Sequence, residues 1–345
     1  MSRALIIALQ YGNLPQYKLN GCFNDADNLT KRLLKIDPKM KIVTMKDNLP
    51  LSSSLFPTSA NILTQLNTLV TSQEKKLFLY YSGHGTNGLD TNKDETTINI
   101  TNNGKTILTT QSLSRDSCIV TNEKNKIGLI VDDSLERILN KLDAAKKMYA
   151  FFDSCNSGTI LDLSWLTMGC YSGEFVSTNY NALQKEIKQK CTIVSANYPD
   201  KLKSIKGNVI LITGCRDSSY SYEVWDGTKT VGLFTYHLCA LLDTNVEKLS
   251  LLQFYYNIIA MINFNDQIPM LSYSQKLDLN NTMMSDLKIP ANNKIVNLLE
   301  SNLNSFRSLD WNLINDDIIE SVNPINNNKN YNYNGMKLLL MHKNL

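Results

Sequence analysis

The chain has 345 residues, of which 43% are hydrophobic, and a formal net charge of +3 from 35 basic and 32 acidic side chains. This balance is ordinary for a soluble globular protein and lacks the concentrated positive charge of a nucleic-acid-binding surface. The longest apolar runs are far too short to span a bilayer, and the N-terminus has no signal-peptide pattern. We therefore expect a cytoplasmic protein with one large domain or two modest ones, and no nucleic-acid or membrane partner.

The seven cysteines indicate free thiols in a reducing compartment. Their number is odd, and no two have the Cys-x-x-Cys spacing that a redox or metal motif would show. The chain is too long for a small disulfide scaffold. Zinc is not indicated either, because the three histidines do not cluster with cysteines.

Short apolar runs alternate with helical patterns along most of the chain. Residues rich in Val, Ile, Leu and Phe predict strands at 3–9, 41–45, 76–83, 148–154, 191–197 and 208–214. Apolar residues at helical spacing predict helices over Asn24–Ile36 and around residues 62–70. The alternation predicts an α/β fold with a mainly parallel sheet that helices cover on both faces. In such sheets, functional groups collect beyond the carboxyl ends of the strands.

Two regions depart from this alternation. Residues 99–126 are polar and weakly periodic, and we expect an extended loop or hairpin insertion there. From about residue 281 to residue 345 asparagine becomes frequent, and we expect a C-terminal extension of unknown role.

Two strand ends carry the candidate catalytic residues. The run "LFLYYSGHG" brings His84 to the end of one predicted strand, and "YAFFDSCNSG" brings Cys155 to the end of another. Asp-Ser-Cys also occurs at Cys118, but that copy lies in the polar region, and a nucleophile must be held rigidly near its base. We predict a His84–Cys155 dyad, because a neighbouring imidazole activates a thiol that is mostly protonated at neutral pH. The backbone N–H groups of Gly85 and Cys155 are candidate oxyanion donors.

Each of these residues also has an ordinary structural interpretation. A lone histidine is usually a polar surface or core residue, and cysteine is often a small buried hydrophobic residue. The pairing of the two motifs at strand ends favours catalysis over these alternatives. His237, in the apolar helical run "GLFTYHLCALL", is predicted to be structural.

The motifs "YYSGHG" and "FFDSCNSG" resemble the His and Cys motifs of metacaspases, the caspase-like cysteine peptidases of plants, fungi, protists and bacteria. The resemblance extends, in order, over roughly residues 3–280 and includes "RALIIALQYGN", "LNGCFNDADNL", "KDETTI", "LIVDDSL", "GTILDL", "GNVILITGCRDSSYS" and "QIPMLSYS". It implies a caspase-like sandwich over residues 1–280. A large-subunit-like part would end near residue 180, and a small-subunit-like part would run from about 190 to 280.

The resemblance also implies roles for individual residues. An S1 pocket for the side chain of Lys or Arg would be lined by Cys22, Asp25, Ser82 and Asp153, since acidic groups complement a cation. Calcium would be bound by Asp94, Asp132, Asp133 and Asp162, whose carboxylates are hard-oxygen ligands. Without the resemblance each of these residues would be read as structural. Asp133 with Glu136 also fits an N-cap and capping box of the helix that follows.

Two departures from the family pattern bear on the site. Asn156 stands where a His often follows the catalytic Cys, and "SSYSYE" replaces "DQTSAD" after the Gly-Cys-basic-Asp stretch. We expect the first to tune the site without abolishing it. The second leaves the pocket beyond S1 undefined.

The resulting hypothesis is a calcium-dependent cysteine endopeptidase of the type I-like group. It would act as a monomer, cleave after Lys or Arg in protein substrates, and process itself, with Lys185, Lys188 and Lys190 as candidate cleavage sites. The alternative is a caspase-fold interaction protein that has lost proteolysis.

Overall fold

The centre of the molecule is an eight-stranded sheet with the strand order β11-β10-β15-β12-β9-β3-β1-β2. The computed structural model describes residues 1–89, 98–102, 105–110, 116–171, 191–197, 205–217, 219–262, 267–289, 330–333, 336–339 and 341–342. Five neighbouring strands are parallel: β12 (Asn208–Thr213), β9 (Lys147–Asp153), β3 (Lys76–Ser82), β1 (Ser2–Ala8) and β2 (Lys41–Lys46). The other three add in antiparallel fashion: β15 (Met270–Tyr273), β10 (Trp165–Tyr171) and β11 (Cys191–Asn197). The predicted α/β fold with a mainly parallel sheet is confirmed.

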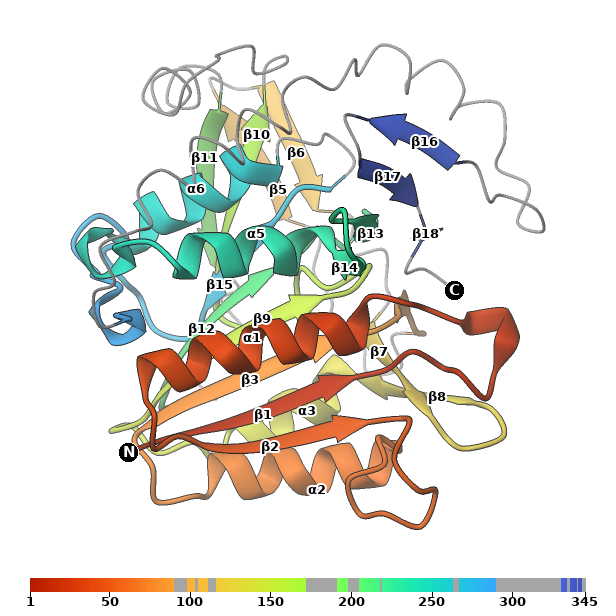
Figure 1. Ribbon diagram of the computed structural model, residues 1–345. Helices are drawn as coiled ribbons and strands as arrows, with labels where there is room; N and C mark the ends of the chain where they lie inside the picture. The colour runs from red at the N-terminus through yellow and green to blue at the C-terminus, as the bar shows by residue number, and fades with distance from the viewer. Residues whose placement is uncertain are drawn as a thin grey trace.

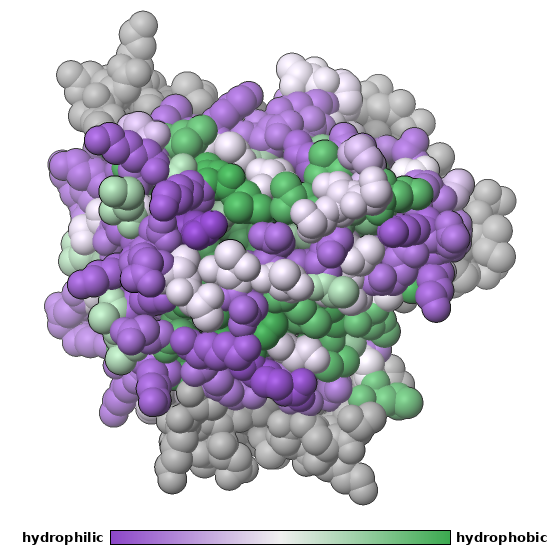
Figure 2. Space-filling view, turned by 90° about the horizontal axis from the view of Figure 1, so that it is seen from below, coloured by the Kyte–Doolittle hydropathy of each residue, from purple (hydrophilic) through white to green (hydrophobic). Residues whose placement is uncertain are grey.

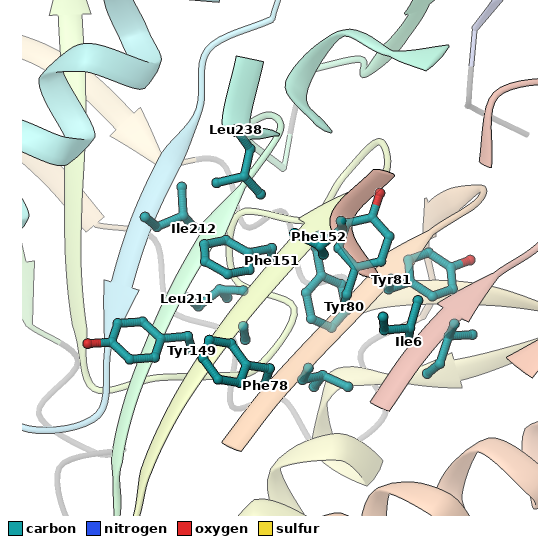
Figure 3. Packing of buried hydrophobic residues seen from close by; sticks show 14 of the residues in the cluster. Ile6, Phe78, Tyr80, Tyr81, Tyr149, Phe151, Phe152, Leu211, Ile212 and Leu238 are labelled. Atoms are coloured by element: carbon teal, nitrogen blue, oxygen red, sulfur yellow. The ribbon is translucent and has the colours of Figure 1, made fainter. Parts of the chain in front are cut away.

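The parallel half is held together by a core of apolar and aromatic side chains. Strands β3 and β9 are buried along nearly their whole length, as expected for parallel strands that helices cover on both sides. The rings of Phe78 and Tyr149 stack across the pair with their centroids 5.7 Å apart. Figure 3 shows these rings among the other aromatic residues of the two strands. This packing fixes the register of β3 against β9.

Helices cover the sheet on its two faces (Figure 1). One face carries α1 (Cys22–Ile36), α5 (Leu233–Leu242) and α6 (Leu251–Ile262), and the other carries α2 (Ser59–Val70) and α3 (Asp132–Leu139). Thr58 caps α2 by accepting a hydrogen bond from the N–H of Asn61. Hydrophilic residues cover most of the face seen from below in Figure 2, with hydrophobic residues in smaller groups between them. Among the described residues, no helix is long and apolar enough to cross a membrane.

The polar region after β3 contains two hairpins. Strands β5 (Ile98–Asn102) and β6 (Lys105–Thr110) form the first. Strand β7 (Ser117–Asn122) pairs with β8 (Ile127–Val131) and with β4 (Gly85–Asn87), directly after the His84 motif. All six residues of β7 are buried. Strand β7 therefore belongs to the core of the domain, whereas most of β8 is only partly buried or exposed.

A small sheet forms near the carboxyl ends of the parallel strands. Strands β13 (Tyr222–Trp225) and β14 (Thr230–Gly232) make a hairpin, and β18 (Met341–His342) pairs with the other edge of β13. A separate hairpin joins β16 (Asn330–Tyr333) and β17 (Met336–Leu339). Short 3-10 helices η1 (Pro15–Tyr17), η3 (Val246–Lys248) and η4 (Ser285–Leu287) complete the described elements. Part of the C-terminal extension thus lies against the main domain.

The helix α3 begins differently from the predicted capping box. Its N-cap is Val131, without a side-chain cap, and Asp133 lies within the first turn. The capping interpretation of Asp133 was wrong. The Oδ1 atom of Asp132 instead accepts the N–H of Asp133 at 3.0 Å. Negative charge in a first turn is favourable in any case, because it complements the helix dipole.

His237 in α5 is buried, as its sequence context predicted, and burial lowers its pKa to about 3. In the unfolded chain this imidazole binds a proton near pH 6.5, whereas in the folded chain it stays neutral at that pH. Its contribution to the free energy of unfolding is therefore fully present above pH 6.5 and is lost as the pH drops. Between pH 7 and pH 5 we expect this residue alone to cost about 2 kcal/mol. Urea unfolding of wild type and His237→Leu at both pH values measures it. The variant should lose that part of the pH dependence while His342→Gln retains it, and equal slopes in wild type and His237→Leu would contradict the expectation.

Candidate active site

His84 and Cys155 lie at neighbouring ends of two paired strands. In the parallel ladder Ser82 is opposite Asp153, so that His84 and Cys155 each follow two residues beyond the same rung. The carbonyl of Asp153 also accepts the N–H of Gly83. A Cβ atom at Gly85 would overlap the carbonyl oxygen of Cys155, which shows how closely the two segments approach. The structure therefore brings the two predicted catalytic segments together.

Tyrosines that the sequence analysis did not identify hold the His84 segment. The hydroxyl of Tyr11 accepts the N–H of His84 at 3.0 Å, and the hydroxyl of Tyr81 donates to its carbonyl at 2.6 Å. The hydroxyl of Tyr11 donates to the carbonyl of Val120 in β7 at 2.8 Å, and the hydroxyl of Tyr81 lies 2.9 Å from the same carbonyl oxygen. The rings of Tyr11 and His84 lie with centroids 4.9 Å apart. Burial raises the pKa of Tyr11, so its hydroxyl stays neutral and keeps the proton that it donates to the Val120 carbonyl.

The imidazole of His84 is oriented by the backbone of η1. Its Nε2 atom lies 2.8 Å from the carbonyl oxygen of Tyr17. A carbonyl oxygen can only accept a hydrogen bond, so Nε2 carries the proton and Nδ1 is the acceptor nitrogen of the neutral ring. Any residue could supply this carbonyl, and the sequence of η1 therefore carries no signal for it.

The thiol of Cys155 lies against the segment that precedes β13. The N–H of Ser221 donates to the Sγ atom at 3.2 Å. Asn156 follows in the left-handed region, with φ of 49°, which Asn tolerates better than most residues. Its side-chain amide donates to the carbonyl of Asp217, and its N–H donates to that of Ser219. Asn156 thus joins the turn that carries the thiol to the 217–221 segment.

Three buried carboxylates converge beside the dyad. Asp25 accepts from Ser82 Oγ at 3.1 Å and from the N–H of Gly232 at 2.8 Å. Asp153 accepts from Ser221 Oγ at 2.5 Å and from Thr235 Oγ1 at 2.6 Å. A Cβ atom at Gly232 would overlap the Asp153 carboxylate and lie 2.9 Å from Asp25 Oδ2. The glycine thus leaves room for both acids in one place.

The third carboxylate is Glu223, which the sequence analysis missed. It accepts the N–H of Gly21 at 2.6 Å and lies 3.9 Å from the Sγ atom of Cys22. In the β13–β14 hairpin it is opposite Gly232, and so it joins the same acidic group. All three carboxylates are fully buried. The only available signal was that the unfamiliar segment "SSYSYE" also ends in an acid.

The four predicted calcium ligands divide into a cluster of three and one that lies outside the described residues, Asp94. Carboxylate oxygens of Asp132, Asp133 and Asp162 lie within 4.8 Å of one another. Asp132 and Asp162 are buried, and Asp162 has a φ of 48°. Three hard-oxygen donors this close repel one another, and a hard divalent cation would offset that repulsion. The donor set fits Ca²⁺.

Comparison with known proteins finds similarity to metacaspases. A family model described as the peptidase C14 domain of metacaspases matches residues 2–164. Metacaspase-1 of Yarrowia lipolytica is 27% identical over 310 residues, which are 81% of this chain and 62% of that protein. Metacaspase-1 of Schizosaccharomyces pombe is 27% identical over 82% of this chain and 69% of its own length. For metacaspase-5 of Trypanosoma brucei brucei the values are 27%, 80% and 51%.

These relatives are longer than the region they share with the chain, which spans 62% of the first and 51% of the trypanosomal protein. A crystal structure of a protein from Geobacter sulfurreducens matches 84% of this chain and 99% of its own, with a TM-score of 0.53 and 19% identity. At that identity the match shows a shared fold alone. Over the matched peptidase domain and along most of its length, the chain is similar to metacaspases.

Proposed function

We propose that this protein is a cysteine endopeptidase in which Cys155 is the nucleophile and His84 the general base. The observation that carries the proposal is the common register of the two strands, which places both residues two positions beyond one rung. Catalysis by a thiol requires such a base within reach and held in one orientation. The hydrogen bond to the Tyr17 carbonyl supplies that orientation.

The chemistry follows from the ring tautomer. Nδ1 of His84 takes the thiol proton, and the thiolate attacks the carbonyl carbon of the scissile bond. The tetrahedral oxyanion would be stabilised by the N–H groups of Gly85 and Cys155, which belong to segments in close contact. The imidazolium then protonates the leaving amine, and water hydrolyses the thioester with His84 again as base.

The acidic group formed by Asp25, Asp153 and Glu223 supports cleavage after Lys or Arg. Three buried carboxylates create a strong negative potential that attracts a cationic side chain and repels an acidic one. The hydroxyl and N–H donors around them fix the directions of the carboxylates. A basic side chain would therefore meet a preorganised site.

Calcium dependence and self-processing are part of the proposal. Asp132, Asp133 and Asp162 would hold Ca²⁺, which would supply positive charge to bring their segments together. In the described conformation Cys155, Asp25 and Asp153 are fully buried. A substrate can reach them only after a movement, which gives an activation step a physical role. Self-cleavage would occur after Lys185, Lys188 or Lys190, which lie outside the described residues. The proposal also includes a monomeric, cytoplasmic protein.

The alternative of an inactive interaction protein rests on the altered segment after Gly214 and on the C-terminal extension. The structure gives that segment three contacts with the site: the Ser221 N–H to the thiol, the Ser221 hydroxyl to Asp153, and Glu223 in the acidic group. The unfamiliar sequence thus retains groups that a peptidase needs, and these contacts favour the enzyme.

The first prediction concerns activity and specificity. Purified protein should hydrolyse fluorogenic peptides that end in Arg or Lys, and not those that end in Asp, because the acidic group repels a carboxylate. Chelation of calcium should abolish the activity and added Ca²⁺ should restore it. Cys155→Ala should be inactive under all conditions. Cleavage after Asp, or activity that survives in Cys155→Ala, would refute the assignment.

The second prediction concerns Glu223. Glu223→Gln keeps the hydrogen-bond acceptor for Gly21 but removes one of the three charges. Since a hydrogen bond to a charged group is worth about 1.5–3 kcal/mol, kcat/KM for Arg substrates should fall by about 10- to 100-fold. Asp27→Asn, on the exposed side of α1 in a surface pair with Lys46, is the control and should retain wild-type rates. Equal kcat/KM values in Glu223→Gln and wild type would place Glu223 outside the pocket.

The third prediction concerns the close approach of Gly85 to Cys155. Gly85→Ala forces the two segments apart, and a displacement of about 1 Å can cost about 100-fold in rate. Gly12→Ala is the control, because a Cβ atom there meets nothing within 4 Å. Steady-state rates and melting temperatures of both variants test this. A fully active Gly85→Ala enzyme would exclude Gly85 from the oxyanion site.

A further inference from the structure

The carboxylate of Asp217 contacts two residues, Thr159 and Ser117, that are themselves hydrogen-bonded to the acidic cluster of Asp132, Asp133 and Asp162. Its Oδ1 atom accepts the N–H of Thr159 at 2.9 Å and the hydroxyl of Ser117 at 3.4 Å. Loss of solvation raises the pKa of this carboxyl, and the Thr159 and Ser117 hydrogen bonds act in the opposite direction. The side chain therefore joins the turn after Cys155 to the first residue of β7.

Ser117 connects this carboxylate to the acidic cluster. Its N–H donates to Asp132 Oδ2 at 2.6 Å, while its hydroxyl lies 3.2 Å from that of Thr159. Thr159 is also linked to the cluster directly, because its carbonyl accepts the N–H of Asp162 at 2.7 Å. Asp132 and Asp162 are therefore each hydrogen-bonded to a residue, Ser117 or Thr159, that also contacts Asp217.

The backbone of Asp217 continues the connection to the thiol. Its carbonyl accepts the side-chain amide of Asn156, the residue next to the nucleophile. Four residues further along the same segment, the N–H of Ser221 contacts the Sγ atom. The side chain and the main chain of one residue thus contact Thr159 and Asn156 within the Cys155–Asp162 turn.

We propose that Asp217 is a positioning residue that couples the Asp132–Asp133–Asp162 cluster to the geometry of Cys155. Occupation of the cluster by a divalent cation orders Asp132 and Asp162, and the contacts of Ser117 and Thr159 with Asp217 transmit that order to the turn that presents the thiol. Loss of the Asp217 carboxylate leaves the cluster and the acidic pocket intact but uncouples the cluster from Cys155. This inference rests on the proposed function for its kinetic consequence, although the coupling itself can be measured without turnover.

The test compares Asp217→Ala with wild type by two measurements. The first is the rate at which iodoacetamide alkylates Cys155, followed by mass spectrometry of its peptide, with and without Ca²⁺. The second is the melting temperature over the same Ca²⁺ range, which reports binding at the cluster. Wild type should show both responses. Asp217→Ala should keep the shift in melting temperature and lose at least 80% of the calcium-dependent change in alkylation rate.

In peptide hydrolysis the same variant should lose about 10- to 100-fold in kcat with KM for Arg substrates nearly unchanged, because the acidic pocket is not altered. Asp217→Asn retains an Oδ1 acceptor and should recover part of the loss. Asp226→Ala is the matched control. Asp226 also accepts turn N–H groups, from Thr228 and Lys229, but has no described contact with either site. It should behave as wild type.

Ser117→Ala provides an independent route if Asp217→Ala does not fold. It removes the hydroxyl contact and leaves the Ser117 N–H to Asp132 in place. It should weaken the coupling in the same direction, and in combination with Asp217→Ala it should add little further loss. Wild-type calcium dependence of alkylation in Asp217→Ala, or in Ser117→Ala where the former cannot be made, would overturn the inference. Absence of hydrolysis by the wild type would instead overturn the proposed function.

Discussion

The structure depends above all on the register between β3 and β9. The two strands end at one pair of opposite residues, Ser82 and Asp153. The candidate base and nucleophile each follow two residues later in the chain. Side chains alternate between the faces of a sheet, so a slip of one residue would place Asp153 on the wrong face and separate the acids from one another. Stacked rings such as Phe78 and Tyr149, far from the chemistry, oppose that slip. The hydrophobic core is therefore what aligns the site.

The parallel half of the fold could be predicted from the sequence because its strands are buried on both faces and read as continuous apolar runs. The partners of the hairpins β7–β8 and β13–β14 could not. Strand β7 pairs with β4 as well as with β8, and β13 pairs with β18 as well as with β14. Pairing of β18 with β13 joins positions more than a hundred residues apart, and no local pattern predicts it. Strand pairing of this kind depends on tertiary context.

The candidate site divides in the same way. His84 and Cys155 were predictable because each follows an apolar strand and is flanked by small residues. The groups that orient them were not. The carbonyl of Tyr17 carries no side-chain signature, and Tyr11 reaches His84 only through the folding of a loop. Glu223 was missed because its neighbours differ from the family pattern, although its acidic character was retained. Comparison with a family motif detects identical residues more readily than it detects a different residue of the same charge.

The segment from Gly214 to Trp225 contributes residues to several parts of the site at once. Asp217 contacts Thr159, in the turn that leads to Asp162 of the acidic cluster. Ser221 contacts both the thiol and Asp153, and Glu223 completes the acidic group. Clustered carboxylates are unfavourable without a cation, so both the cluster of Asp132 and the acidic group are relieved by binding positive charge. Because one continuous segment contacts the surroundings of both, the coupling that we propose would let a cation at one location change the geometry at the other. Coupling of this kind requires no long pathway, only a short backbone segment whose two ends are held by different charges.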